Sequence, residues 1–370
     1  LEHQTSVDGE LDTTIVFTVS DYEQRLENLR RVANEELYLR YSHFFECRTQ
    51  AGELQDQLTL LAEQLLQASV KVACDEMQLA LSPVSVIGFG KLGSRGMMPK
   101  SDLDLVYLCQ SMEEHVLASQ FASRLNTVIN TPMREGRVYE LDTRLRPSGQ
   151  SGSVTISLGS YRQHQIERAH TWSHLALVSA RAVAGDADIG EQFQIIKAEI
   201  LSRPRDLRQF LYDCAKMLKR VRDQRIQPAA TDQFSAKLRP GGLFELEYVL
   251  SCLIVLKCIE QPELAGGSYD EMVGAVLDEQ GRELAQALLF LRGLQLEIRL
   301  FGHDGMRFEE LPYPILEHVL ATLQCENIAM LTDRLEQSTQ LTLQLIEHFF
   351  TDVDMSQLGE WKETRVHWLS

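Results

Sequence analysis

The chain has 370 residues, which is too long for one compact core and predicts two or three domains. Its 36 basic and 53 acidic side chains leave a net charge of -17, which repels polyanions and argues against a long nucleic acid as partner. No apolar run approaches the ~20 residues that cross a bilayer, and the N-terminus lacks the positive-then-apolar layout of a secretory signal peptide, so we expect no membrane partner.

The cysteines indicate a reducing compartment. There are seven of them, scattered along the chain, and none belongs to a CxxC pair. This usage fits free, mostly buried thiols, so we expect a cytoplasmic protein without a zinc site. His170 and His174 have the i, i+4 spacing that can bind zinc, but without a third ligand nearby we interpret the pair as structural.

The first 80 residues predict helices. Segments 21–45 and 53–81 place apolar residues three and four apart with charges between them, which is the pattern of amphipathic helices. Pro83 interrupts this pattern, and the short β-branched run Val84–Phe89 is typical of a strand. A glycine-rich connection then leads to Ser101–Cys109, which predicts a second strand.

The remainder of the chain contains one more predicted strand and then becomes helical. Segment 117–133 predicts a helix that ends near Pro132, and Gly136–Pro147 alternates as a third strand. The strongest amphipathic pattern runs through 207–226, while 237–257 predicts a loop that leads into an apolar helix.

Together these elements predict an α+β fold. We expect an N-terminal helical region at 1–80, a small mixed α/β unit with the catalytic groups at 81–185, and a C-terminal helical bundle at 186–370. The chain contains no short internal repeat and no low-complexity tract.

Two aspartates, Asp102 and Asp104, stand in the otherwise apolar second strand. Residues two apart on a strand point the same way, so these carboxylates project side by side. An unpaired buried carboxylate costs several kcal/mol, and two so close raise each other's pKa unless a cation lies between them. Asp142, flanked by Arg144 and Arg146, adds a third carboxylate on a later strand. Three such carboxylates predict a Mg²⁺ site, with two ions around one phosphorus atom.

The glycine-rich connection between the two strands contains candidate phosphate contacts. We expect Gly93 and Ser94 to open a turn or a helix and to leave backbone N–H groups free for phosphate oxygens. Lys91 is a further candidate. The GxGxxG spacing at 88–93 resembles a dinucleotide fingerprint, but an Asp-x-Asp strand follows it instead of a long crossover helix.

Four segments resemble, in order, the motifs of the glutamine synthetase adenylyltransferases, a family in the nucleotidyltransferase superfamily of DNA polymerase β. They read "GFGKLGSRGMMPKSDLDLVYL" from residue 88, "YELDTRLRPSGQSG" from 139, "HTWSHLALVSARAVAGD" from 170 and "GGLFELEYVLSCLIVL" from 241. The resemblance covers roughly residues 20–260. The chain departs from the family pattern at Ser94, which replaces a glycine, and at Gly96 and Met97, which replace Glu-Leu.

The resemblance implies a polymerase β-like nucleotidyltransferase sheet and transfer of AMP from ATP to a tyrosine of glutamine synthetase, with release of pyrophosphate. It implies that Asp102 and Asp104 hold two Mg²⁺ ions and that Asp142 holds the ion that activates the tyrosine hydroxyl. The implied nucleotide-binding residues are Lys91, Gly93, Ser94, Ser101, Arg144 and Arg146. A PII-type signalling protein is a possible further partner.

The full family protein has two such units, one that attaches AMP and one that removes it by phosphorolysis. Ser148 in "RLRPSG" and the sequence "TWSH" resemble the attaching unit. Phosphorolytic removal of AMP is the alternative activity. A catalytically silent regulatory module is a second alternative, although an intact carboxylate cluster argues against it.

Several residues have two open interpretations. In the alternative without a metal, Asp102 caps a turn and Asp104 is a charged residue on an edge strand. Glu245 and Glu247 either reach the active site or stabilise the first turn of a helix. A cationic run either docks an acidic partner or is the solvated face of a helix; it comprises Arg203, Arg205, Arg208, Lys216, Lys219, Arg220, Arg222 and Arg225.

Overall fold

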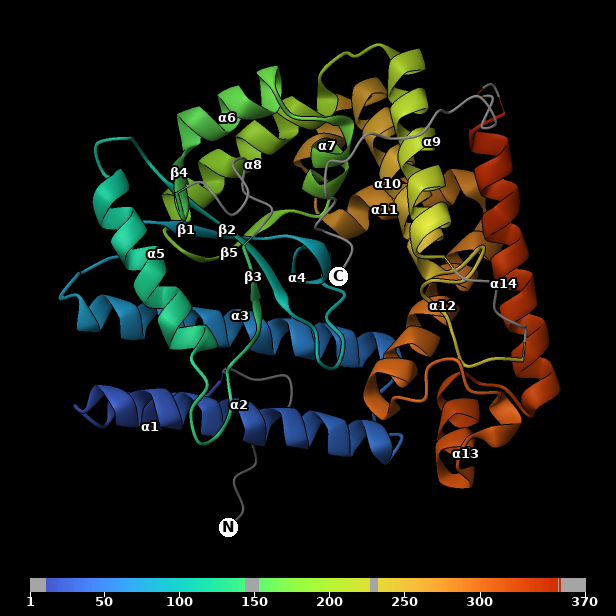
Figure 1. The fold of residues 1–370 in the computed structure, drawn as a ribbon, viewed down its shortest axis with the longest axis horizontal. Helices are drawn as coiled ribbons and strands as arrows, with labels where there is room; N and C mark the ends of the chain where they lie inside the picture. The colour runs from blue at the N-terminus through green and yellow to red at the C-terminus, as the bar shows by residue number, and fades with distance from the viewer. Residues whose placement is uncertain (1–10, 144–152, 227–231, 352, 354–370) are drawn as a thin grey trace.

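The computed structural model describes residues 11–143, 153–226, 232–351 and 353, and has an α+β fold with one small sheet among many helices (Figure 1). The strands are β1 (Ser85–Gly88), β2 (Leu103–Cys109), β3 (Leu141–Asp142), β4 (Thr155–Ser157) and β5 (Arg181–Gly185). The helices are α1 (Thr14–Phe17), α2 (Tyr22–Phe45), α3 (Ala51–Glu76), α4 (Gly90–Gly93), α5 (His115–Asn130), α6 (Leu158–Glu167), α7 (Thr171–Leu177), α8 (Ala187–Ser202), α9 (Leu207–Gln224), α10 (Leu243–Glu260), α11 (Tyr269–Gln280), α12 (Arg282–Phe301), α13 (Tyr313–Thr322) and α14 (Ile328–Phe349), with the 3-10 helices η2 (Pro262–Gly266) and η3 (Phe308–Glu310).

The two predicted N-terminal helices are confirmed as α2 and α3, which lie side by side below the sheet (Figure 1). Each begins at a capping residue. Asp21 accepts a hydrogen bond from the backbone N–H of Gln24, and Gln50 forms a reciprocal capping box with Glu53. These contacts satisfy N–H groups that the first helical turn leaves without an intrahelical acceptor.

The sheet has the order β3-β2-β1-β5, with β4 also paired to β2. β1 lies antiparallel to β2 and β5, whereas β3 and β4 run parallel to β2 at its two ends. Because Gly88 pairs with Leu105, the glycine-rich connection leaves β1 directly beside Asp104. The topology therefore places this connection and the first carboxylates at the same edge of the sheet.

The first two predicted strands are confirmed, but the third is shorter than predicted. Within the described residues, the strand in segment 136–147 is confined to Leu141–Asp142. The preceding residues follow the end of α5 instead, where the Val138 N–H donates to the Ile129 carbonyl at 3.1 Å. β4 and β5 were not predicted, because β4 has only three residues and β5 is an alanine-containing edge strand.

Both faces of the sheet are covered by helices. One face packs with α2, α3 and α5 in an apolar cluster that includes Leu61, Leu105 and Phe121. The other face packs with the helices from α6 onward in a larger cluster that includes Val106 and Phe193. The alternating side chains of β2 divide between these two clusters, as the two-residue period of a strand requires.

The C-terminal part is helical, and the predicted helices at 207–226 and within 237–257 are confirmed as α9 and α10. α12 packs against α10 and α14 and also reaches α3, so it joins the helical part to the N-terminal region (Figure 1). None of the helices in the described residues is long and apolar enough to cross a membrane. All seven cysteines are free, and all except Cys47 are buried, as predicted.

Candidate active site

Three carboxylates converge where β2 and β3 pair. The parallel register sets Asp104 opposite Asp142, and Asp102 precedes β2 by one residue. One carboxylate oxygen from each residue lies within 4.8 Å of the other two. Asp142 is buried and the other two are half-buried. We call these residues the carboxylate triad; the structure brings the three together, and their role as metal ligands stays a prediction.

Gly90 allows Asp104 to occupy its position. A Cβ atom on Gly90 would lie 2.3 Å from Asp104 Oδ2, and the φ of Gly90 is +53°, in the left-handed region that favours glycine. The sequence analysis did not single out this residue for the site. The signal was present in the spacing of the glycines, but only the fold shows which glycine faces the carboxylate.

The glycine-rich connection forms a single helical turn, α4. Gly93 and Ser94 end this turn instead of opening it: their N–H groups each donate at 3.0 Å, to the carbonyls of Phe89 and Gly90. The expectation that these two N–H groups are free for phosphate is therefore wrong in this structure. Ser94 and Lys91 nevertheless line the cleft described below, so their side chains remain candidate phosphate contacts.

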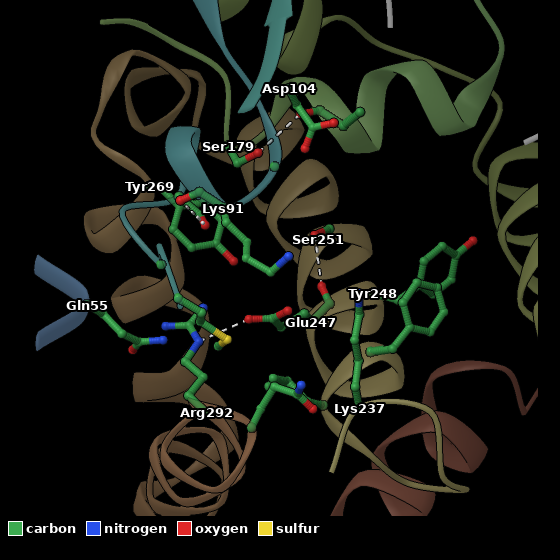
Figure 2. Close-up of a pocket in the computed structure, with 18 of the residues that line it drawn as sticks. Gln55, Lys91, Asp104, Ser179, Lys237, Glu247, Tyr248, Ser251, Tyr269 and Arg292 are labelled. Carbon is green, nitrogen blue, oxygen red and sulfur yellow. Dashed lines mark hydrogen bonds and ion pairs between the residues drawn. The ribbon is translucent and has the colours of Figure 1, made fainter. Parts of the chain in front are cut away.

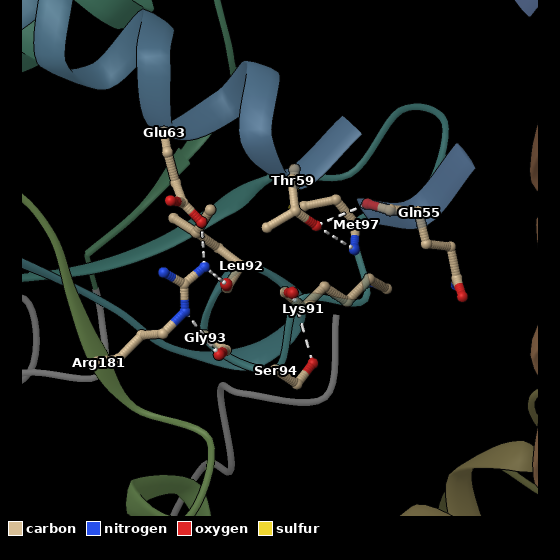
Figure 3. Close-up of polar contacts among 9 residues, drawn as sticks. All are labelled: Gln55, Thr59, Glu63, Lys91, Leu92, Gly93, Ser94, Met97 and Arg181. Atoms are coloured by element: carbon tan, nitrogen blue, oxygen red, sulfur yellow. Dashed lines mark hydrogen bonds and ion pairs between the residues drawn. The ribbon is translucent and has the colours of Figure 1, made fainter. Parts of the chain in front are cut away.

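Arg181 of β5 holds the end of this turn (Figure 3). Its Nη2 donates to the Leu92 carbonyl at 2.9 Å, and its Nε donates to the Gly93 carbonyl at 3.0 Å. Its guanidinium also pairs with Glu63 of α3. The absence of a side chain at Gly93 lets the Ser179 carbonyl approach the turn closely, because a Cβ atom on Gly93 would lie 2.3 Å from that oxygen. The turn is thus fixed from β5 and α3, which are far apart in the sequence.

A cleft separates the sheet from the C-terminal helices (Figure 2). Its first side, which we call the sheet wall, comes from α4, β2 and the end of α7 and includes Lys91, Ser94, Asp104 and Ser179. Its second side, the helical wall, comes from the loop before α10 and from α10, α11 and α12, and its polar residues include Lys237, Glu247, Ser251, Tyr269 and Arg292.

Charged groups on the helical wall face the sheet wall. Glu247 Oε1 accepts a hydrogen bond from Arg292 Nε at 3.0 Å. Burial, followed by the nearby Lys91 cation, lowers the pKa of Lys237 to about 8, although Glu247 and Asp102 act in the opposite direction. A half-buried ammonium near a second lysine is a favourable environment for a polyanion.

The apolar lining of the cleft is formed by Leu175, Ala176, Leu243, Phe244 and Tyr248. The rings of Phe244 and Tyr248 are stacked, with centroids 6.1 Å apart and planes at 23°. The cleft therefore combines an apolar, aromatic part with a cationic part that lies beside a carboxylate. Sequence reasoning did not identify the helical wall apart from Glu247, because its residues come from separate helices.

A second hollow adjoins the carboxylate triad. Asp102 lines it together with Tyr41, Lys100, Arg137 and Tyr139. The triad therefore touches both hollows, since Asp104 lines the cleft and Asp102 lines this second one, and Met98 lines both.

The other predicted nucleotide-binding residues do not all reach the cleft. Ser101 is buried, and its Oγ accepts a hydrogen bond from the Met98 N–H at 3.2 Å, which shapes the turn before β2. Ser101 lines the second hollow instead of the cleft. Arg144, Arg146 and Ser148 lie outside the described residues.

The structure separates Glu245 from Glu247. Glu245 is fully buried, pairs with Arg222 and accepts a hydrogen bond from the Gly241 N–H at 2.6 Å, which is a structural role. Glu247, two residues later, lines the cleft. The structural interpretation therefore holds for Glu245, and the interpretation that the side chain reaches the candidate site holds for Glu247.

His174 has a structural environment, as predicted. Its Nε2 lies 3.0 Å from the Gln165 carbonyl, and its Nδ1 accepts from Arg205 at 3.3 Å. Burial lowers the pKa of His174 to about 4, so the ring is neutral near pH 7. Within the cationic run, Lys219 pairs with Asp223 at 2.8 Å and Arg222 pairs with the buried Glu245, and the choice between a docking surface and a solvated face stays open.

A small mixed sheet that presents clustered carboxylates beside a cationic cleft is typical of proteins that handle metal-bound phosphates. The family model described as glutamate-ammonia ligase adenylyltransferase matches residues 2–196, which is more than half of the chain. The chain belongs to this family. The family resemblance seen in the sequence motifs is thereby confirmed.

Curated relatives carry the name bifunctional glutamine synthetase adenylyltransferase/adenylyl-removing enzyme. The protein of Chromobacterium violaceum is 31% identical over 316 residues, which are 82% of this chain and 35% of the relative. The protein of Aromatoleum aromaticum is 30% identical over 251 residues, or 66% of this chain and 26% of the relative. The protein of Xanthomonas campestris is 35% identical over 235 residues, or 59% of this chain and 25% of the relative. The chain thus spans between 25% and 35% of the length of these relatives.

Proposed function

We propose that this chain is a protein adenylyltransferase unit, which transfers AMP from ATP to a tyrosine hydroxyl of glutamine synthetase and releases pyrophosphate. The observation that carries the proposal is the carboxylate triad, which contributes Asp104 to a cationic cleft and Asp102 to an adjoining hollow. The sheet is proposed to be of the polymerase β type, within the catalytic part of a division at 1–80, 81–185 and 186–370.

The triad has the chemistry that Mg²⁺ requires. Its three carboxylates offer oxygen ligands within 4.8 Å of one another, and hard divalent cations prefer such ligands. Asp102, Asp104 and Asp142 would hold the ions. Bound there, Mg²⁺ would lower the pKa of the attacking hydroxyl and neutralise charge on the phosphates.

ATP occupies the cleft in this proposal. Lys91 and Lys237 bind the phosphate chain, because they bring cations from the two walls into the cleft that Asp104 also lines (Figure 2). The adenine ring packs against the apolar lining around Phe244 and Tyr248. Glu247 holds Arg292 in place at 3.0 Å.

The tyrosine substrate enters the second hollow, which Asp102 lines. Its oxygen attacks the α-phosphorus of ATP, and the bond from that phosphorus to the oxygen of pyrophosphate breaks. Asp142, the most buried carboxylate of the triad, accepts the tyrosine proton. The entry of the two substrates through separate hollows that both touch the triad brings the hydroxyl and the phosphates to the same metal site.

Radiolabelled ATP tests the direction of the reaction. Incubation of the chain with Mg²⁺, ATP labelled in the α-phosphate and unmodified glutamine synthetase is expected to label a tyrosine of glutamine synthetase. The control is the Asp104→Asn variant, which is expected to give no label. Phosphate-dependent release of ADP from adenylylated glutamine synthetase, without any incorporation, would instead support the removing activity. The absence of both reactions would support a silent module, and binding to a PII-type protein is then the measurement to make.

The location and the exclusion of nucleic acid are also proposals. We propose a cytoplasmic protein, because its cysteines are free, and one that acts on another protein, because a net charge of -17 disfavours nucleic acid. Retention on a nucleic-acid column at physiological salt would contradict this.

A further inference from the structure

A cysteine, a histidine and a glutamate form a line at the junction of α2, α12 and α13. Cys47 Sγ, just beyond the end of α2, lies 3.7 Å from Nδ1 of His318 in α13. The opposite ring nitrogen, Nε2, lies 3.7 Å from Oε2 of Glu297 in α12. The three groups come from distant parts of the sequence, and none of them lines the cleft beside the carboxylate triad.

The two inner groups of this line are buried. The side chains of His318 and Glu297 are 7% and 0% exposed. Glu297 Oε1 accepts a hydrogen bond from the Thr322 hydroxyl, whereas His318 Nε2 and Glu297 Oε2 have no hydrogen-bond partner among the described residues. Each such buried atom costs about 1–3 kcal/mol, so the arrangement is not explained by stability.

Aromatic rings fix the orientation of the imidazole. The Phe44 ring meets His318 at 5.0 Å and 75°, and the Phe301 ring meets it at 5.5 Å and 74°. The Phe45 ring lies 5.7 Å away. This packing keeps Nδ1 turned toward the sulfur and Nε2 turned toward the carboxylate, which is the order that a thiol, its base and an orienting carboxylate require.

Cys47 differs from the other cysteines in its surroundings. It is exposed, whereas the other six are buried. Its φ is 53°, in a region where a non-glycine residue costs about 1 kcal/mol or more. The neighbouring charges, Glu46 and Arg48, pair with each other at 2.8 Å.

We propose that Cys47 is a thiol-modification site for low-molecular-weight disulfides, with His318 as its general base and Glu297 as the group that orients and stabilises the protonated imidazole. The Cys47 sulfur gives its proton to His318 Nδ1 and attacks one sulfur of the disulfide. A new S–S bond forms while the S–S bond of the reagent breaks, and the departing thiolate takes the proton from His318. One disulfide and one protein thiol thus become one mixed disulfide and one small thiol.

The burial of the two inner groups supports these roles. Burial lowers the pKa of His318, so the imidazole is a neutral proton acceptor near pH 7. Burial raises the pKa of Glu297 to about 7, and its ionised form would be stabilised by the imidazolium that the reaction creates.

The reaction of the native chain with dithiobis(nitrobenzoate), which releases a coloured thiolate, tests the proposal. One thiol is expected to react at least about tenfold faster than the cysteines of the unfolded chain at the same pH. This fast phase is expected to vanish in Cys47→Ser. Mass spectrometry of the chain treated with oxidised glutathione is expected to place the mixed disulfide on Cys47.

Two variants separate the base from its surroundings. His318→Gln and Glu297→Gln are each expected to slow the fast phase about tenfold, while circular dichroism shows a folded chain. Glu317→Gln is the matched control, because it removes a neighbouring exposed carboxylate of α13 and is expected to leave the rate unchanged. A fast phase that survives in folded Glu297→Gln and His318→Gln, or a Cys47 rate equal to that of the unfolded chain, would overturn the proposal.

Discussion

The two walls of the cleft differ in how their residues are brought together. The sheet wall takes Lys91, Ser94 and Asp104 from a single motif, folded as one turn and one strand. The helical wall takes Lys237 and Glu247 from one local segment, the loop before α10 and the start of α10, and takes Arg292 from the separate helix α12. Each wall thus starts from a local segment, whereas the pairing of Glu247 with Arg292 and the approach of Lys237 to Lys91 depend on helix packing.

The largest expected effect is the loss of the carboxylate triad on the sheet wall. Asp104→Asn and Asp142→Asn are each expected to reduce adenylyl transfer by about a thousandfold or more, because an amide carries no charge for a divalent ion. The measurement is labelled AMP incorporation alongside Mn²⁺ binding. Asp278→Asn, at an exposed position of α11, is the matched control. If either variant keeps activity within about tenfold of the native chain, that carboxylate is not required for adenylyl transfer.

Gly90→Ala tests whether the glycine turn positions the triad. The new methyl group would lie 2.3 Å from Asp104 Oδ2, so the carboxylate must move, and the positive φ adds about 1 kcal/mol of strain. We expect activity to fall about a hundredfold and the free energy of unfolding to fall by about 1 kcal/mol or more. Gly52→Ala is the control, because a Cβ atom there meets nothing within 4 Å and helix propensity favours alanine. Unchanged activity in Gly90→Ala would show that Asp104 tolerates displacement.

Lys237→Gln tests the helical wall. We expect the KM for ATP to rise about tenfold, with a smaller change in kcat, because a cation that binds the phosphates is lost. The exposed Lys71→Gln, on α3, is expected to leave the KM unchanged.

The pH dependence of ATP affinity follows from the same lysine. Because burial lowers the pKa of Lys237 to about 8, its ammonium is present below that pH and is lost above it. ATP affinity of the native chain is therefore expected to weaken as the pH rises through about 8, and the variant is expected to lack this step. In the unfolded chain the Lys237 side chain keeps its proton up to about pH 10.4, whereas in the folded chain it loses this proton near pH 8. The contribution of Lys237 to the free energy of unfolding therefore rises between these two pH values. Calorimetry in two buffers is expected to show proton uptake on ATP binding near pH 8. An identical pH profile for the variant would contradict this.

The smallest expected effect concerns Arg181, which we interpret as a positioning residue. Arg181→Gln removes the hydrogen bonds to the Leu92 and Gly93 carbonyls, so kcat is expected to fall about tenfold while the KM changes little. Glu63→Gln, its half-buried partner, is expected to lower kcat about threefold. Arg162→Gln is the control, because Arg162 pairs with the exposed Glu199 and does not touch the turn. Equal effects on KM and kcat would indicate a direct contact with the nucleotide instead.

Some of this fold could be predicted because its signals are local. The three- and four-residue spacing in α2, α3 and α9 depends on side chains within one helix. The apolar runs of β1 and β2 are equally local. The strands that were missed or overextended, β3, β4 and β5, have two, three and five residues and are defined by their pairing partners. Such short segments carry too little periodicity to be seen before the sheet forms.

The amino-acid sequence by itself determined the two N-terminal helices, the Asp-x-Asp strand and the family, because each depends on residues close together in the chain. The tertiary structure alone decided that Gly93 and Ser94 use their N–H groups within α4 and that Glu245 is structural while Glu247 faces the cleft. It also decided that Lys237 approaches Lys91 and that His318 lies between Cys47 and Glu297. The contacts of Lys237 and of His318 join elements remote in sequence, and their geometry depends on how helices pack against the sheet and against one another.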